Sequence, residues 1–198
     1  MRVLHVCSEL FPLLKTGGLA DVTGALPPAL AEFGCDSRAL VPGFPAFMSN
    51  VIDKELVAEL GSKFGAADVR LYLAKTPDSS ITLYVIDAPD LFDRLGNPYA
   101  DANNQAYADN YRRFALLGWV AAQLAGSLDP EWSAEVVHGH DWHAGLAPAY
   151  LKAEEIKTGQ KLAASIFTVH NLAYQGVFPY RVLAEIDLPI WFFNIHGL

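Results

Sequence analysis

Short apolar runs alternate with amphipathic stretches along this chain. The runs have the length and composition of buried strands, and they occupy Val3–Cys7, Arg38–Val41, Val69–Ala74, Ile81–Asp87, Glu135–His138 and Ala164–Val169. Helical patterns lie between most of these runs. This alternation predicts an α/β fold with a mainly parallel sheet and helices on both of its faces.

Three stretches have the spacing or composition of helices. In residues 104–126 an apolar stripe recurs every three or four positions, at Tyr107, Tyr111, Phe114, Gly118, Ala121 and Ala125. A second helix is expected from His143 to Lys157. A third covers Leu19–Phe33, in which Pro27 and Pro28 predict a kink or a break. Residues 71–85 instead predict a hairpin that turns at Pro77–Ser80.

The segment Lys15–Val22 carries the clearest candidate chemistry. It joins the first predicted strand to the first predicted helix, a layout that directs backbone N–H groups at an anion. Gly17 and Gly18 lack a Cβ, so a ligand can approach the main chain, and Lys15 adds a positive charge beside the opening. Neither Lys15 nor Asp21 has a capping role there. The alternative is an ordinary strand-to-helix connection.

Known phosphate and acyl-enzyme motifs do not fit this segment. The chain has neither the Walker A pattern nor the Gly-x-Gly-x-x-Gly fingerprint at this place. Lys15-Thr16-Gly17 matches the Lys-Thr-Gly of penicillin-binding enzymes. Those enzymes also require Ser-x-x-Lys, and no serine here has a lysine three residues later.

Composition narrows the class of partner. The net charge of −8 and a pI near 5.1 argue against nucleic acid, whose phosphates demand clustered basic residues. No uncharged apolar stretch is long enough to predict a membrane span, and Met1 leads straight into a strand rather than a signal peptide. The two cysteines, Cys7 and Cys35, form no disulfide framework, which favours a reduced, cytoplasmic protein. The length of 198 residues permits one or two domains.

Four segments together resemble the family of bacterial glycogen synthases and plant starch synthases. They are Ser8–Pro12 with Lys15–Val22, Leu116–Trp119, His138–Leu146 and Phe167–Gly176. The resemblance runs over residues 1–198. It implies the Rossmann-like N-terminal half of a GT-B type glycosyltransferase that needs no cofactor. The implied reaction transfers glucose from ADP-glucose to the non-reducing end of an α-1,4-glucan such as glycogen, with retention of configuration.

The resemblance also implies that more chain follows in the family. There the N-terminal, acceptor-side domain continues past this length, and a nucleotide-sugar domain with the main phosphate-binding Arg and Lys comes after it. Residues 1–198 are therefore expected to be an incomplete domain that is inactive alone. This half does not distinguish ADP-glucose from UDP-glucose. A non-catalytic carbohydrate-binding or regulatory module with the same fold remains the alternative.

Three loops that follow predicted strands are expected to line one crevice: Glu9–Gly18, Gly139–His143 and His170–Gly176. Asp141 and His170 are the expected catalytic residues. By the resemblance, His170 lies against the transferred glucosyl group. The residues expected to bind donor phosphates and sugar are Lys15, Gly17, Gly18, Asp21, His170 and Asn171. The expected acceptor-side residues are Tyr99, Asn103, Asp141, His143 and Tyr174.

Each of these assignments has a structural alternative. Asn171 could instead be a turn residue, since Asn is common in turns. Asn103 could be only the N-cap of a helix. Tyr99 and Tyr174 could stack on sugar rings, but they could equally pack in the core. Three of the four tryptophans, Trp119, Trp132 and Trp191, are expected to be buried.

The histidine-rich segment His138–His143 also permits a metal site. Imidazole and carboxylate are zinc ligands, but the spacing fits poorly, because His138 falls in the buried run and Asp141 stands one place early for the dinuclear hydrolase pattern. We therefore expect no metal. A metal-dependent hydrolase built on His140 and His143 is the weaker alternative. Asp141 is instead expected to accept hydrogen bonds from sugar or water, and His143 to donate one.

Overall fold

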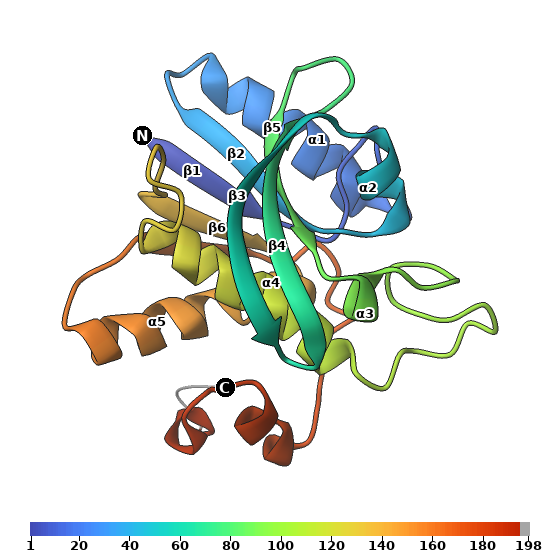
Figure 1. Cartoon of the computed structure of the whole chain (residues 1–198), viewed down its shortest axis with the longest axis vertical. Helices are drawn as coiled ribbons and strands as arrows, with labels where there is room; N and C mark the ends of the chain where they lie inside the picture. Colours follow the sequence, from blue (N-terminus) through green and yellow to red (C-terminus); the bar gives the residue numbers. More distant parts are fainter. Residues whose placement is uncertain (195–198) are drawn as a thin grey trace.

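A computed structural model, which describes residues 1–194, contains a seven-stranded sheet in the order β3-β4-β5-β2-β1-β6-β7 (Figure 1). The strands are β1 (Arg2–Val6), β2 (Asp36–Pro42), β3 (Ile52–Lys63), β4 (Ala66–Lys75), β5 (Thr82–Asp87), β6 (Val136–His140) and β7 (Ala164–Thr168). All pairs from β5 to β7 are parallel, whereas β3 and β4 add an antiparallel edge. The prediction of a mainly parallel α/β sheet is confirmed, as is the hairpin between β4 and β5.

Helices cover the sheet on both sides. They are α1 (Gly18–Ala31), α2 (Pro45–Asn50), α3 (Pro89–Phe92), α4 (Asn110–Ala125) and α5 (Ala147–Thr158), with 3-10 turns η1 (Trp142–Ala144), η2 (Tyr180–Glu185) and η3 (Ile190–Phe192). The step from β1 to β2 through α1 runs across the sheet in the opposite direction to the step from β6 to β7 through α5. Because such crossovers are right-handed, α1 and α5 lie on opposite faces.

Helices α4 and α5 pack closely against each other (Figure 1). A Cβ added at Gly118 of α4 would lie 2.9 Å from the backbone nitrogen of Ala147. The predicted helical stripe is therefore a packing stripe, and its glycine is the point of closest approach.

Four elements differ from the sequence prediction. Strand β3 was missed because it is a mostly exposed edge strand with charged residues and several register shifts, so it contains no apolar run. Helix α4 begins at Asn110, because Asp101 draws residues 103–105 into a turn by accepting the N–H groups of Asn103 and Gln105. Helix α5 begins at Ala147, after η1.

The fourth difference is in α1, where no break occurs. The helix continues across Pro27 and Pro28, although neither proline has a backbone N–H to donate. Of the three tryptophans, Trp132 is buried and Trp119 partly so, but Trp191 is 59% exposed, so the expectation of burial was wrong for Trp191. Within residues 1–194 we find no helix with the length and apolar character that crossing a membrane requires.

Candidate functional site

The site begins at the point where the strand order reverses. Strand β1 lies between β2 and β6, so the crossovers on its two sides diverge and leave a crevice at the carboxyl ends of β1 and β6. The loop Glu9–Gly18, called the glycine loop below, follows β1. Asp141 follows β6 directly, and His170 follows β7. The loops that the sequence analysis assigned to one crevice thus leave the same edge of the sheet.

Asp141 ties two of these loops together. Its Oδ1 accepts the backbone N–H groups of His170 at 2.7 Å and of Asn171 at 3.3 Å. Its Oδ2 accepts no hydrogen bond from the described residues and remains available to a ligand. The Asp141 backbone has φ 58° and ψ 177°, a region that residues other than glycine rarely adopt. Such strain costs about 1–3 kcal/mol and is typical of functional sites.

The buried Glu9 side chain holds the glycine loop in shape through hydrogen bonds. This carboxylate is 3% exposed and accepts hydrogen bonds from the backbone N–H groups of Thr16 and Gly17, at 2.7 and 3.1 Å, and from the hydroxyls of Thr16 and Tyr99. The N–H of Gly17 is therefore occupied, and our expectation that it faces a phosphate is not met at that atom. Sequence analysis missed this role of Glu9; the available signal was a carboxylate directly after a buried strand.

The two glycines have no intramolecular requirement to be glycine. Gly17 has an extended φ of −154°, and a Cβ added at Gly17 or Gly18 would meet nothing within 4 Å. The absence of side chains here leaves open space beside the main chain. Beside them, Lys15 Nζ contacts both carboxylate oxygens of Asp21 at 2.7 and 2.8 Å, and both side chains are about half exposed.

Two predicted acceptor-side residues lie in different surroundings, His143 in the packed interior of its loop and Asn103 on the surface. His143 is 6% exposed, and its ring stacks on Tyr99 with centroids 4.5 Å apart. Its burial lowers the pKa of His143 to about 3, so the ring is neutral. His143 thus packs in the loop and does not face solvent as a donor. Asn103 lies on an exposed turn and is not the N-cap of α4, a position that Asp109 occupies.

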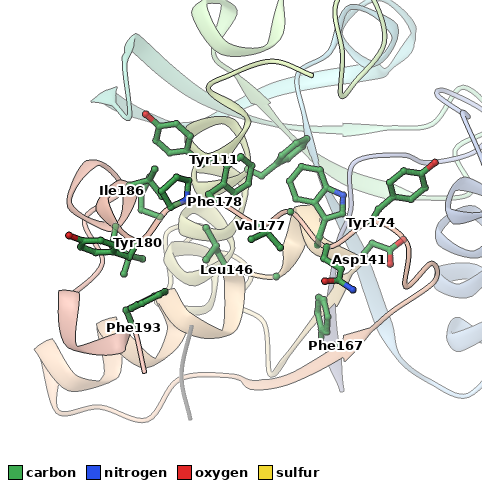
Figure 2. Close-up of a pocket in the computed structure, with 18 of the residues that line it drawn as sticks. Tyr111, Asp141, Leu146, Phe167, Tyr174, Val177, Phe178, Tyr180, Ile186 and Phe193 are labelled. Atoms are coloured by element: carbon green, nitrogen blue, oxygen red, sulfur yellow. The ribbon is translucent and has the colours of Figure 1, made fainter. Parts of the chain in front are cut away.

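A pocket of about 550 Å³ opens beside Asp141 (Figure 2). Of the predicted site residues, Asp141 and Tyr174 line it, whereas the glycine loop does not. Its other walls are mostly apolar, with both aromatic and aliphatic side chains. They come from α4, η1, β7 and the segments after β7, and the aromatic ones include Trp142, Phe167 and Tyr180. Position 176 requires glycine, because its φ is +60° and an added Cβ would lie 2.1 Å from the Trp142 ring in this wall. Aromatic walls of this kind suit the apolar faces of sugar rings.

Four histidines meet beneath the loops. Three of them, His5, His138 and His140, bring one ring nitrogen each within 4.8 Å of the others. Strand β6 extends to His140, and this residue is fully buried. The prediction that His140 lies on the loop Gly139–His143 was therefore wrong. His138 and His140 lie two residues apart on β6 and share a face of the sheet, with ring centroids 4.1 Å apart. Sequence analysis did not identify His5, because its partners lie more than 130 residues away.

Several ring nitrogens of this cluster already have hydrogen-bond partners within the protein. His5 Nδ1 lies 3.3 Å from His140 Nε2, His140 Nδ1 lies 3.0 Å from His170 Nε2, and His138 Nε2 lies 2.7 Å from the Thr168 hydroxyl. Among residues 1–194, no carboxylate joins the three imidazoles in the cluster to balance a divalent charge. The geometry thus favours hydrogen-bonded neutral rings over metal ligands.

The purified protein is therefore expected to hold no stoichiometric metal. Elemental analysis after dialysis should give far less than one equivalent of zinc or another transition metal. About one equivalent that is lost in His140→Ala would contradict this expectation.

Buried histidines make the fold sensitive to acid. Burial lowers the pKa of His5 to about 4, of His140 to about 2 and of His143 to about 3, against 6.5 for an exposed ring. The unfolded chain binds more protons below pH 6.5, so this contribution is complete above that pH and is lost as pH falls toward 4. At pH 4.5 each ring should favour unfolding by about 2–3 kcal/mol.

Urea unfolding between pH 7.5 and 4.5 measures this loss. The variant His143→Phe keeps a ring in the same packing. It should take up about one proton fewer on unfolding, so its free energy of unfolding should fall less steeply as pH is lowered. Equal slopes for the two proteins would show that His143 is not buried and neutral.

The chain is similar to known proteins over almost its whole length. The family described as starch synthase catalytic domain matches residues 2–198. The chain is 65% identical over all 198 residues to a glycogen synthase of Francisella philomiragia, of which it covers 41%. It is 64% identical to a glycogen synthase of Francisella tularensis subsp. novicida, of which it covers 40%. The chain thus spans about two fifths of the length of these curated relatives.

A solved structure shares the fold. The catalytic domain of starch synthase IV from Arabidopsis thaliana, bound to ADP and acarbose, superposes with a TM-score of 0.78 and 25% sequence identity. The match covers 96% of this chain and 38% of the Arabidopsis chain.

Proposed function

Because this chain belongs to the starch synthase catalytic domain family, we propose that it forms the N-terminal, acceptor-side half of a glycogen synthase. The whole enzyme transfers glucose from ADP-glucose to the non-reducing end of an α-1,4-glucan and retains the anomeric configuration. The observation that carries this proposal is the 65% identity to a glycogen synthase over the entire chain. The binding of ADP and acarbose by the Arabidopsis relative supports the choice of donor and of a saccharide acceptor.

The glycine loop supplies part of the donor site. A departing diphosphate requires stabilisation of the charge on its oxygens. The open space at Gly17 and Gly18 admits that group to the start of α1, where the Gly18 N–H and the Lys15 ammonium serve as donors. Lys15 reaches the diphosphate by leaving Asp21, at little cost because exposed ion pairs are weak. The remaining clamp belongs to the C-terminal domain.

The strand-exit residues hold the sugar. Asp141 Oδ2, the His170 imidazole and the Asn171 amide supply an acceptor and donors for hydroxyl groups at one edge of the crevice. Tyr174 and the aromatic pocket beside Asp141 receive glucose rings of the acceptor. The chemistry assigned to this half is thus binding and positioning of neutral sugar next to a charged leaving group.

The proposal also covers location. Cys7 and Cys35 are both unpaired, which supports a reducing, cytoplasmic compartment. The identity to Francisella proteins supports a bacterial origin.

The test is a transfer assay with the full-length protein. Glycogen and ADP-glucose should give sustained ADP release and incorporation of labelled glucose, and UDP-glucose should be used much less well. Saccharide binding without transfer from any nucleotide sugar would instead identify a non-catalytic module.

A protein of these 198 residues alone is expected to release no ADP in the same assay. It lacks the second half of the diphosphate clamp and the closure that excludes water. The control is a heat-treated sample of the same protein. Turnover above that control would show that this half contains a complete active site.

A further inference from the structure

A row of three imidazoles connects the interior of the sheet to the candidate site. His5 comes from β1, His140 from β6, and His170 from the loop after β7. The row runs from His5 Nδ1 to His140 Nε2 at 3.3 Å and from His140 Nδ1 to His170 Nε2 at 3.0 Å. His5 and His140 are fully buried, and only His170 reaches the crevice.

The far end of the row sets the direction of every proton in it. His5 Nε2 is buried and has no hydrogen-bond partner among the described residues. A buried N–H without an acceptor is rarer and costlier than an unused lone pair, so His5 carries its proton on Nδ1. His5 then donates to His140 Nε2. His140 must carry its own proton on Nδ1 and donate to His170 Nε2.

Both buried rings stay neutral at physiological pH, which this order of donors requires. Burial lowers the pKa of His5 to about 4 and of His140 to about 2. His138 stacks on His140 but lies outside the row, because its Nε2 bonds the Thr168 hydroxyl. In both contacts of the row, one ring nitrogen thus donates its proton and the facing ring nitrogen accepts it.

We propose that His5 and His140 are positioning residues that hold His170 in the tautomer protonated on Nδ1. In that tautomer His170 accepts from His140 through Nε2 and offers a neutral N–H donor on its other nitrogen. This rests on the proposed function, in which the group at His170 is the transferred glucose, whose hydroxyl oxygens accept such a bond. Neutrality of the donor matters because the reacting sugar carbon gains positive charge in glycosyl transfer.

A matched pair of variants in the full-length enzyme tests the row. His5→Leu removes the donor to His140, whereas His5→Asn places an amide N–H near the position of Nδ1. We expect His5→Leu to lower kcat by about 10- to 100-fold at an unchanged KM for ADP-glucose, the loss seen when outer partners of an oriented histidine are removed. His5→Asn should restore kcat to within about threefold of the wild type.

Nitrogen spectra of ¹⁵N-histidine-labelled enzyme read the tautomer directly. The signals of His170 are identified by their loss in His170→Ala. They should report the Nδ1–H tautomer in the wild type and in His5→Asn, and a mixture or the Nε2–H tautomer in His5→Leu.

An Nε2–H tautomer of His170 in the wild-type enzyme would overturn the proposal, even if both His5 variants failed to fold. Wild-type kcat in His5→Leu with an unchanged His170 spectrum would also overturn it. Failure of the proposed function is distinguishable. In that case the wild-type protein would transfer no glucose, while the tautomer would still be read from the same spectra.

Discussion

Replacing Asp141 by alanine in the full-length enzyme is expected to lower kcat by about a hundred- to a thousandfold and to change the donor KM little. A lost hydrogen bond to a developing charge costs about 2.7–4 kcal/mol. Asp141 acts twice, since Oδ2 is available to sugar and Oδ1 holds the backbone N–H groups of His170 and Asn171. His170→Ala should show the same pattern, because interactions made in the transition state affect kcat.

Asp141→Asn is the matched control. Asparagine has nearly the same size and shape as aspartate, so it replaces one side chain at this strained backbone by a matched one. It keeps an oxygen for the two backbone N–H groups, but it lacks the negative charge. Its kcat should therefore lie between those of the wild type and the alanine variant. If Asp141→Ala keeps near-normal kcat and melts at the wild-type temperature, Asp141 only shapes the loop, and the sugar lies elsewhere.

Replacing Glu9 by alanine should both destabilise the protein and weaken donor binding. The change leaves the N–H groups of Thr16 and Gly17 without their acceptor in a partly buried place, whereas the Tyr99 hydroxyl keeps Ser8 as a partner. We expect a loss of about 3 kcal/mol in the free energy of unfolding, because buried donors left unpaired cost about 1–3 kcal/mol each. The KM for ADP-glucose should rise about tenfold, since the glycine loop loses its support.

Urea unfolding and steady-state kinetics measure the two effects separately. Glu9→Gln keeps the side-chain size and one acceptor oxygen, and it should lose less on both measures. Wild-type stability and KM in Glu9→Ala would mean that the loop holds its shape without this carboxylate.

Sequence patterns predicted what depends on neighbours along the chain. The strand, glycine loop and helix around Gly17 and Gly18 follow from local composition, and the parallel sheet follows from the alternation of apolar runs. Strand β3 escaped prediction because an exposed edge strand has no apolar run, and its pairing with β4 is a tertiary property.

The supports of the site come from distant parts of the chain and could not be read from spacing. Glu9 and Tyr99 are 90 residues apart, and His5 and His140 are 135 residues apart. His143 was expected to face a ligand because it is polar and follows a strand. The stacking of its ring on Tyr99 buries it instead, and nothing in the local sequence indicates that contact.

A crystal structure of the full-length protein with ADP and a maltooligosaccharide would test the central claim most directly, that the three loops after β1, β6 and β7 form one glucosyl-transfer site. We predict diphosphate density over Gly17 and Gly18, with the Gly18 N–H or Lys15 Nζ within hydrogen-bond distance of a phosphate oxygen. We also predict a glucose unit within hydrogen-bond distance of Asp141 Oδ2 or the His170 ring. A complex in which ADP and the saccharide bind without contacting any of these residues would contradict the account.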